Sequence, residues 1–138
     1  MERANEQWSV FLTSSKLAIE RKLAGMLPWD SGDYLFLKAT PEIPDLTNKI
    51  FGDWSLADLG GVFLQKWNHT RNINCDLIFI DISSLLILEL KTNIPTKHWS
   101  TQKVNEDELL FSFSLNSETV TYKVRREDLS NDASLSAR

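Results

Sequence analysis

The chain has 138 residues, which is the size of one ordinary domain, and its formal net charge at pH 7 is −4. Apolar residues make up 42% of the sequence and include five Trp and seven Phe, so a chain disordered over its whole length is excluded. The single cysteine excludes an internal disulfide, which fits a reducing compartment. No apolar run approaches the roughly 20 residues of a membrane-spanning helix, and the charged N-terminus is unlike a signal peptide. We therefore expect a cytoplasmic protein without a membrane partner.

The first half of the chain shows the spacing of two amphipathic helices. Between residues 5 and 27 the apolar side chains recur at intervals of three, four and seven, which predicts a helix that Pro28 ends. A second helix is predicted to begin at Ser55, whose hydroxyl can cap the free amides, and to run to Trp67. Gly60-Gly61 either weakens this second helix or permits close packing.

The clearest segment is an apolar hairpin in the middle of the chain. Residues 74–82 and 85–92 are nearly continuous runs of branched apolar side chains, and Ser83-Ser84 separates them. Because both faces of each run are apolar, we expect a central antiparallel hairpin that is covered on two sides.

Two further strand regions complete the predicted fold. Residues 34–39 form a short strand, and alternation over residues 108–115 and 119–124 predicts a second hairpin. The fold class that follows is α/β (α+β), with a mixed, largely antiparallel central sheet and helices packed on it. We expect a single globular domain over residues 1–126 and a flexible C-terminal tail over residues 127–138.

The central hairpin carries a group of charged residues with catalytic character. Pairing the hairpin around its turn places Asp76 opposite Glu89, at the polar end of an otherwise apolar face. Carboxylates directly across a strand pair repel each other, and a divalent cation between them converts that repulsion into binding. Oxygen ligands of this kind suit Mg²⁺ or Mn²⁺. Lys91 would hold a phosphate or orient a water beside the metal, so the three residues predict metal-assisted phosphodiester hydrolysis.

The order of these residues resembles that of the PD-(D/E)xK nuclease superfamily. The resemblance rests on Asp76, a turn, and then Glu89-Leu90-Lys91, and it covers roughly residues 5–92. It implies that the two acids bind the metal, that Lys91 assists catalysis, and that Glu20 on the first helix joins the catalytic group. It also implies a magnesium-dependent, endonuclease-like phosphodiesterase that acts on nucleic acid, with DNA preferred to RNA.

Basic residues are scattered along the chain, which counts against a large nucleic-acid footprint. A small basic rim is still predicted at the end of the second hairpin. Strand alternation places Lys123 and Arg125 on one face and Arg126 at the strand end. We assign nucleic-acid contacts to these three residues and expect them on the same side as Lys91.

Two other interpretations stay open. In the first, Asp76 and Glu89 only mark solvent-facing strand ends, and Lys91 pairs with one of them. In the second, the chain is a small non-enzymatic binding protein, such as an inhibitor, an immunity protein or a phage interference protein, that acts through protein–protein contact. The small size and acidic balance fit the second interpretation, and a homodimer is compatible with either.

The remaining candidates are weaker. His69, His98 and Cys75 lack the spacing of a zinc site, and Cys75 is predicted to be a small buried residue. Trp29 and Trp99 are predicted to lie in loops, where they would serve an interface or stack on a base.

Overall fold

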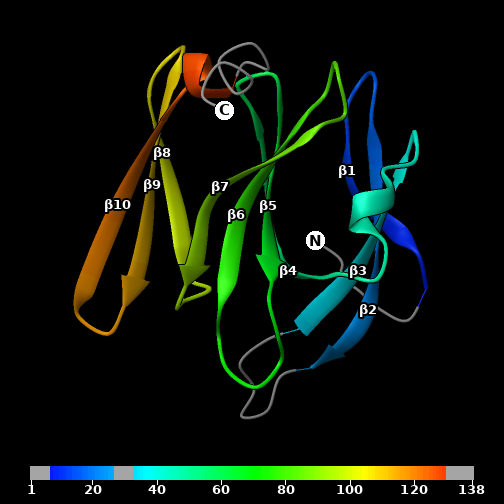
Figure 1. Ribbon diagram of the computed structural model, residues 1–138, viewed down its shortest axis with the longest axis horizontal. Helices are drawn as coiled ribbons and strands as arrows, with labels where there is room; N and C mark the ends of the chain where they lie inside the picture. The colour runs from blue at the N-terminus through cyan, green and yellow to red at the C-terminus, as the bar shows by residue number, and fades with distance from the viewer. Residues whose placement is uncertain (1–6, 27–32, 130–138) are drawn as a thin grey trace.

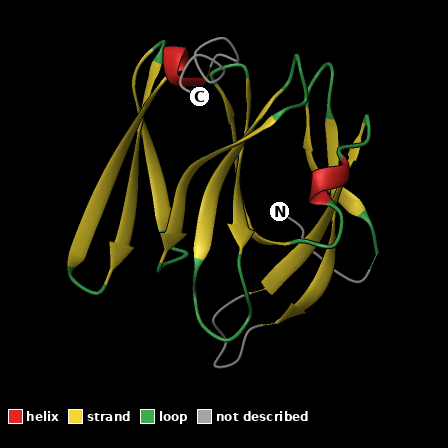
Figure 2. Cartoon of the chain, in the orientation of Figure 1, coloured by secondary structure: helices red, strands yellow, loops and turns green. Residues whose placement is uncertain are grey.

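The computed structural model describes residues 7–26 and 33–129, and this part of the chain is nearly all β-strand (Figure 1). It contains ten strands and two short 3-10 helices, which are the only helical segments drawn in red in Figure 2. The strands are β1 (Ser9–Thr13), β2 (Ala18–Met26), β3 (Asp33–Thr40), β4 (Ile50–Asp58), β5 (Gly61–Trp67), β6 (Cys75–Asp81), β7 (Ile87–Ile94), β8 (Trp99–Asn105), β9 (Glu108–Leu115) and β10 (Glu118–Arg125). The 3-10 helices are η2 (Pro44–Leu46) and η3 (Arg126–Leu129).

Neighbouring strands in each sheet follow one another along the chain. Strands β1 to β7 form a seven-stranded antiparallel sheet in sequence order, and β8 to β10 form a separate three-stranded antiparallel sheet. Antiparallel neighbours need only short connections. Positive φ angles at Leu59, Gly60 and Asn116 lie in two of these tight turns.

The strands pack in three layers, with β5 and β6 in the middle layer. The seven-stranded sheet curls so that β2 and β3 pack on one face of β5 and β6, and we call this apolar cluster the curl core. The other face of β5 and β6 packs against the three-stranded sheet, and we call that cluster the intersheet core. Alternate residues of β6 therefore enter different cores. Ile78 and Ile80 lie in the curl core, whereas Leu77 and Phe79 lie in the intersheet core.

The expected α/β (α+β) fold with helices packed on a sheet is wrong, because the described residues contain no α-helix. Most of the segment predicted as the first helix is β1 and β2. The buried positions before and within β2 alternate as Leu17, Ile19 and Arg21. Arg21 is only 5% exposed and pairs with Asp53 of β4, with 2.6 Å between Nη1 and Oδ1. The buried Arg21 thus interrupts the strand pattern with a charge, and the remaining apolar residues imitate a helical stripe.

The second predicted helix is also wrong, because its segment forms the β4–β5 hairpin. Leu56 and Phe63, expected on one helical face, are cross-strand partners in this hairpin. Gly60 lies in the turn with a φ of 80°. Gly61 approaches Phe79 so closely that a Cβ at position 61 would overlap the ring. The glycine pair therefore serves a turn and a close strand contact.

Both predicted hairpins are present. β9 and β10 form the second hairpin, with Asn116-Ser117 as its two-residue turn, because Leu115 pairs with Glu118. β6 is buried on both faces, as predicted for the central hairpin, although strands rather than helices cover it. β7 lies at the end of the seven-stranded order rather than inside the sheet.

The described part of the chain extends through η3 to residue 129. η3 follows β10 directly, and Leu129 is buried in the intersheet core. Residues 130–138, which make up most of the predicted tail, and the loop residue Trp29 lie outside the described residues. Among the described residues, no helix has the length and apolar character that crossing a membrane requires.

Candidate functional site

Asp76, the first predicted metal ligand, is buried and anchors three segments. The residue is 4% exposed. Its Oδ1 accepts hydrogen bonds from the Asn68 side-chain amide (2.8 Å) and from the Asn93 backbone N–H (3.0 Å). Its Oδ2 lies 3.5 Å from Nζ of Lys66 on β5. The carboxylate therefore joins β6 to β5, to the loop after β5 and to β7.

Glu89 does not stand opposite Asp76, as we expected, but opposite Ile78. The reason is the length of the hairpin loop. The N–H of Asp81 donates to the carbonyl of Leu86 (3.0 Å), so the loop holds residues 82–85 and the pairing shifts by two residues. A shift of two preserves the face. Glu89 consequently lies on the curl-core side of the sheet, as Asp76 does, and lines a small cavity beside Ile78.

Lys91 lies on the opposite face of the sheet from Glu89. Glu89 pairs with Ile78 but Lys91 pairs with Leu77, so one residue of β7 between them, Leu90, is extra and forms a β-bulge. Leu77 belongs to the intersheet core, and the Nζ of Lys91 accordingly lies 5.7 Å from the centre of the Tyr122 ring on β10. The bulge thus separates the two charged residues of the predicted Glu-x-Lys motif.

Glu20 is also apart from the two acids. It lies on the outward face of β2, and its Oε1 is 3.8 Å from Nζ of Lys38 on β3. The structure therefore brings only Asp76 and Glu89 to a common face, and it separates Glu20 and Lys91 from them.

The described residues contain no group of three or more His, Cys, Asp or Glu side chains that could hold a metal ion. Cys75, next to Asp76, is buried, and burial together with the charge of Asp76 raises the pKa of its thiol to about 12. Such a thiol is a poor nucleophile at neutral pH. Hydrolysis of nucleic acid with Mg²⁺ or Mn²⁺ stays a prediction that only an activity assay tests.

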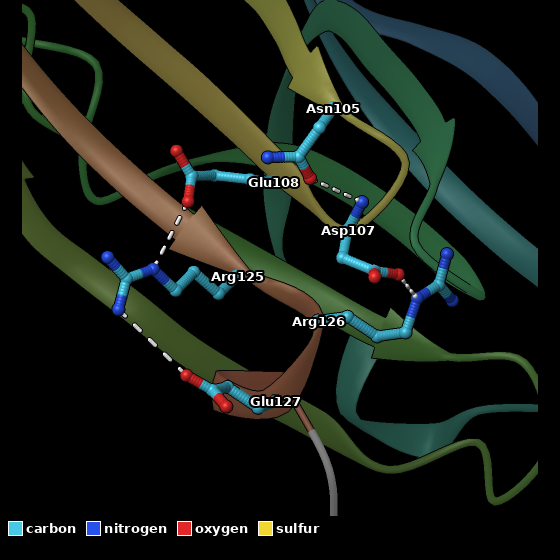
Figure 3. Close-up of a pocket in the computed structure, with 6 residues that line it drawn as sticks. All are labelled: Asn105, Asp107, Glu108, Arg125, Arg126 and Glu127. Carbon is cyan, nitrogen blue, oxygen red and sulfur yellow. Dashed lines mark hydrogen bonds and ion pairs between the residues drawn. The ribbon is translucent and has the colours of Figure 1, made fainter.

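The predicted basic rim is paired with carboxylates (Figure 3). Nε of Arg125 lies 3.2 Å from Glu108, and Nε of Arg126 lies 2.8 Å from Asp107. Lys123 also reaches Glu108, at 3.7 Å, so Lys123 and Arg125 share a face as predicted. The two arginines border an open pocket of about 520 Å³ that Asp107, Glu108 and Glu127 also line, so each arginine has an acidic neighbour there. Positive charge at this end of the molecule is therefore largely neutralised.

The rim does not lie on the same side as Lys91. Tyr122 points into the space between the two sheets, where its hydroxyl donates to the carbonyl of Leu90 (2.9 Å) and its ring contacts Lys91. Lys123 follows Tyr122 on the same strand and points the other way, toward Glu108.

A different surface combines exposed aromatic rings with lysines. It lies on the outward face of β1, β2 and β3, and strand register arranges it in two rows. In the first row, Lys22 lies between Phe36, its cross-strand partner, and Trp8, which comes just before β1. In the second row, Glu20 lies between Val10 and Lys38. We call this surface the outer patch, and it consists of Trp8, Val10, Glu20, Lys22, Phe36 and Lys38.

The outer patch has an apolar centre with two ammonium groups held over it. Trp8 is 38% exposed, Phe36 40% and Val10 64%. Nζ of Lys38 lies 4.4 Å, and Nζ of Lys22 5.9 Å, from the centre of the Trp8 ring. These are cation–π contacts, which keep the lysine charges beside the indole and at the protein surface.

A groove of about 260 Å³ extends from the outer patch to the connection between β3 and β4. One wall comes from Trp8 and β3, and the other comes from the end of η2 and the residues that follow it. The lining residues are Trp8, Phe36, Leu37, Lys38, Leu46, Thr47 and Asn48. The groove gives the patch a concave border, where a projecting side chain of a partner can be accommodated.

Our sequence reasoning missed the outer patch because it placed Trp8 in the buried stripe of a helix. The signal that would have revealed the patch is the two-residue period. Glu20 and Lys22 share one face of a strand, and so do Phe36 and Lys38. Comparisons with protein-family models, with curated proteins and with solved structures found no match.

Proposed function

We propose that the chain is a non-enzymatic binding protein that holds a partner protein on the outer patch. The observation that carries this proposal is the exposed Trp8, with Lys22 and Lys38 held over its ring. Exposed large apolar side chains that gather on one face mark interaction sites. Trp is also the residue type that most often dominates the binding energy of a protein interface.

The chemistry of the outer patch defines the partner. Trp8, Val10 and Phe36 offer apolar area, and the groove beside them has room for one projecting side chain. Lys22 and Lys38 place positive charge around this area, and within the described residues an ion pair engages Lys38, with Glu20, but not Lys22. A complementary partner presents an apolar side chain surrounded by Asp or Glu.

A nucleic acid fits the outer patch less well than an acidic protein does. The ammonium group of Lys38 lies over the Trp8 ring, where a base would have to stack. The chain as a whole carries a net charge of −4, which repels a polyanion that extends beyond the patch. The paired arginines at the other end of the molecule add little free positive charge.

The test begins with site-directed crosslinking in the cells from which the chain comes. A photo-crosslinking amino acid is placed at position 36 in the outer patch and, as a control, at position 112 on β9, in separate full-length proteins. We expect capture of one acidic protein from position 36 and not from position 112. Capture of RNA or DNA from position 36 would replace the proposed partner with a nucleic acid.

The captured protein is then purified, and its dissociation constant is measured for the native chain and for point variants. Trp8→Ala should weaken binding about 30-fold, because an interface Trp typically contributes at least 2 kcal/mol. Val104→Ala removes a side chain of similar exposure on β8 and should leave the affinity unchanged. Equal affinities for the native chain, Trp8→Ala and Phe36→Ala would overturn the proposal.

A further inference from the structure

A second, smaller site lies on the curl-core side of the seven-stranded sheet. It is a cavity of about 250 Å³ between the β3–β4 connection and strands β5, β6 and β7, and we call it the Glu89 pocket. Its lining residues are Asp45, Lys49, Phe51, Lys66, Ile78, Ile87 and Glu89. The pocket and the outer patch are lined by different residues, so the two sites can be tested independently.

The charged groups of the Glu89 pocket fall into two sets. Lys66 is engaged, because it pairs with the buried carboxylate of Asp76 at 3.5 Å. Within the described residues, no ion pair or hydrogen bond engages the side chain of Lys49, Asp45 or Glu89. The pocket therefore offers one ammonium group and two carboxylates that have no internal partner.

The uncharged part of the pocket is apolar. Ile87 is half-buried, and Ile78 and Phe51 lie beneath it in the curl core. Polar groups at the rim and apolar side chains at the floor are the usual arrangement of a small-molecule site. The volume is below the roughly 300–1,000 Å³ of sites for drug-sized ligands, so the pocket has room only for a small molecule.

We propose that the Glu89 pocket binds a small zwitterion with an aliphatic body, such as a branched aliphatic α-amino acid. The ammonium group of the ligand pairs with Glu89, its carboxylate pairs with Lys49, and its aliphatic side chain lies on Ile87 and Ile78. Each charged group of the ligand then meets its opposite in the pocket. Binding is non-covalent, and no bond is made or broken.

Other ligand classes match the pocket less well. A simple anion would meet the carboxylates of Asp45 and Glu89, and a simple organic cation would meet the ammonium groups of Lys49 and Lys66. A divalent metal ion needs six or more oxygen ligands, or waters in their place, and the two lysines repel it. Only a ligand with both charges satisfies Lys49 and Glu89 together.

The experiment measures binding of three related probes to the purified full-length chain by isothermal titration calorimetry. The probes are L-leucine, 4-methylpentanoate, which lacks the ammonium group, and 3-methylbutylamine, which lacks the carboxylate. We expect leucine to bind, and each of the other two to bind about tenfold more weakly or worse, since each loses a charged hydrogen bond.

Two variants then assign each charge to its partner. Glu89→Gln should weaken leucine binding and abolish the preference for leucine over 4-methylpentanoate. Lys49→Gln should likewise abolish the preference for leucine over 3-methylbutylamine. Glu106→Gln and Lys16→Gln change exposed charges elsewhere and should leave all three affinities as in the native chain.

Three outcomes would overturn the proposal. One is the absence of leucine binding to the native chain at concentrations up to about 10 mM. Another is equal binding of leucine and either of its two analogues. The third is leucine binding that Glu89→Gln and Lys49→Gln leave unchanged while thermal unfolding shows both variants to be folded.

Discussion

The two ends of the molecule carry basic side chains in opposite settings. At the end formed by β9, β10 and η3, Arg125 and Arg126 each lie about 3 Å from a carboxylate that belongs to the neighbouring strand or turn. On the outward face of β1 to β3, Lys22 and Lys38 lie instead over the ring of Trp8. Each arginine of the first group is paired with a carboxylate, whereas in the second group Lys38 has Glu20 at 3.8 Å and no ion pair within the described residues engages Lys22.

The residue across the strand influences whether a charge is available to a partner but does not decide it alone, because Lys38 stands opposite Glu20, at 3.8 Å, and its ammonium group also lies over the Trp8 ring. Arg125 stands opposite Glu108, and Lys22 stands opposite Phe36. Cross-strand neighbours lie about 5 Å apart, so an acidic neighbour can form an ion pair with the basic side chain. An aromatic neighbour forms no ion pair and leaves the charge of the basic side chain at the surface. The same principle applies to the acids. The carboxylate of Asp76 is bound by Asn68, Lys66 and the Asn93 N–H, whereas no hydrogen bond or ion pair within the described residues engages that of Glu89.

The largest effect on stability should come from removing the carboxylate of Asp76, which is bound by three neighbours. Asp76→Ala removes the acceptor of the Asn93 N–H and the ion-pair partner of Lys66 in a site that is nearly buried, and it takes one of two acceptors from the Asn68 amide. We expect the free energy of unfolding to fall by about 3 kcal/mol, as for other buried charged partners. Equilibrium unfolding in urea measures this change.

Glu89→Ala is the matched control, because Glu89 is exposed and has no internal partner among the described residues. It should change the unfolding free energy by no more than about 0.5 kcal/mol. Similar stability losses for both variants would contradict the difference that we draw between the two acids.

The same two positions test the nuclease hypothesis. Cleavage of DNA or RNA in Mg²⁺ or Mn²⁺ that folded Asp76→Asn and Glu89→Gln both lose would restore a metal site there.

Charge reversal should weaken partner binding more in the outer patch than at the β9–β10 end. This effect should be smaller than the stability loss of Asp76→Ala. The double variant Lys22→Glu and Lys38→Glu replaces both ammonium groups over Trp8 with carboxylates, so an acidic partner should bind about ten to a hundred times more weakly. The double variant Lys123→Glu and Arg125→Glu makes the same change of charge at the other end of the molecule. Binding of the purified partner at low and high salt measures both effects.

In the native chain and in the second double variant, affinity should fall as salt rises, because the outer patch is intact in both. In the first double variant this salt dependence should be lost or reversed. A stronger loss of affinity from the second double variant than from the first would place the interface on the β9–β10 end and would contradict the proposed role of the outer patch.

Part of the fold follows from the sequence because some patterns have only one physical solution. The continuous apolar runs of residues 74–92 require burial on both faces, and β6 has it. Asn116-Ser117 between alternating runs predicts a two-residue turn, which the structure confirms. The two helix predictions were wrong because each segment makes a contact with a distant residue that its own sequence does not indicate. One is the pairing of the buried Arg21 with the partly exposed Asp53, 32 residues away, and the other is the packing of Gly61 against Phe79.

The candidate site was harder to predict than the fold. Asp76 and Glu89 reach the same face of the sheet, but the four-residue loop and the bulge at Leu90 decide their pairing and the position of Lys91. A bulge is a difference of one residue in register, and no side-chain pattern in β7 marks it. Counting residues along the strand therefore fails at Leu90, the position that decides whether Glu89 and Lys91 of the predicted motif share a face.

The smallest effect concerns an ion pair that links the two sheets. Nζ of Lys103 on β8 lies 2.8 Å from Oδ1 of Asp58 at the end of β4. Partial burial alone would raise the pKa of Asp58, but the hydrogen bonds from Lys103 and from the Leu59 N–H, with the charges of Lys103 and Arg126, hold the pKa below its ordinary value. The folded state therefore favours the ionised carboxylate. Its contribution to stability is present above the ordinary Asp pKa of about 3.9 and disappears as the pH falls through the lower pKa of the folded state.

Asp58→Asn should accordingly lower the free energy of unfolding at pH 7, by less than about 1 kcal/mol because the pair is near the surface. The difference from the native chain should shrink as the pH falls below about 4, since the native carboxylate is then protonated as well. Urea unfolding of both proteins at pH 7 and at pH 3 measures the change. Asp107→Asn is the control in the β8–β9 turn, where Arg126 pairs with an exposed carboxylate. A difference for Asp58→Asn that grows toward acid pH would mean that the folded state prefers the protonated acid, and that burial outweighs the link to Lys103.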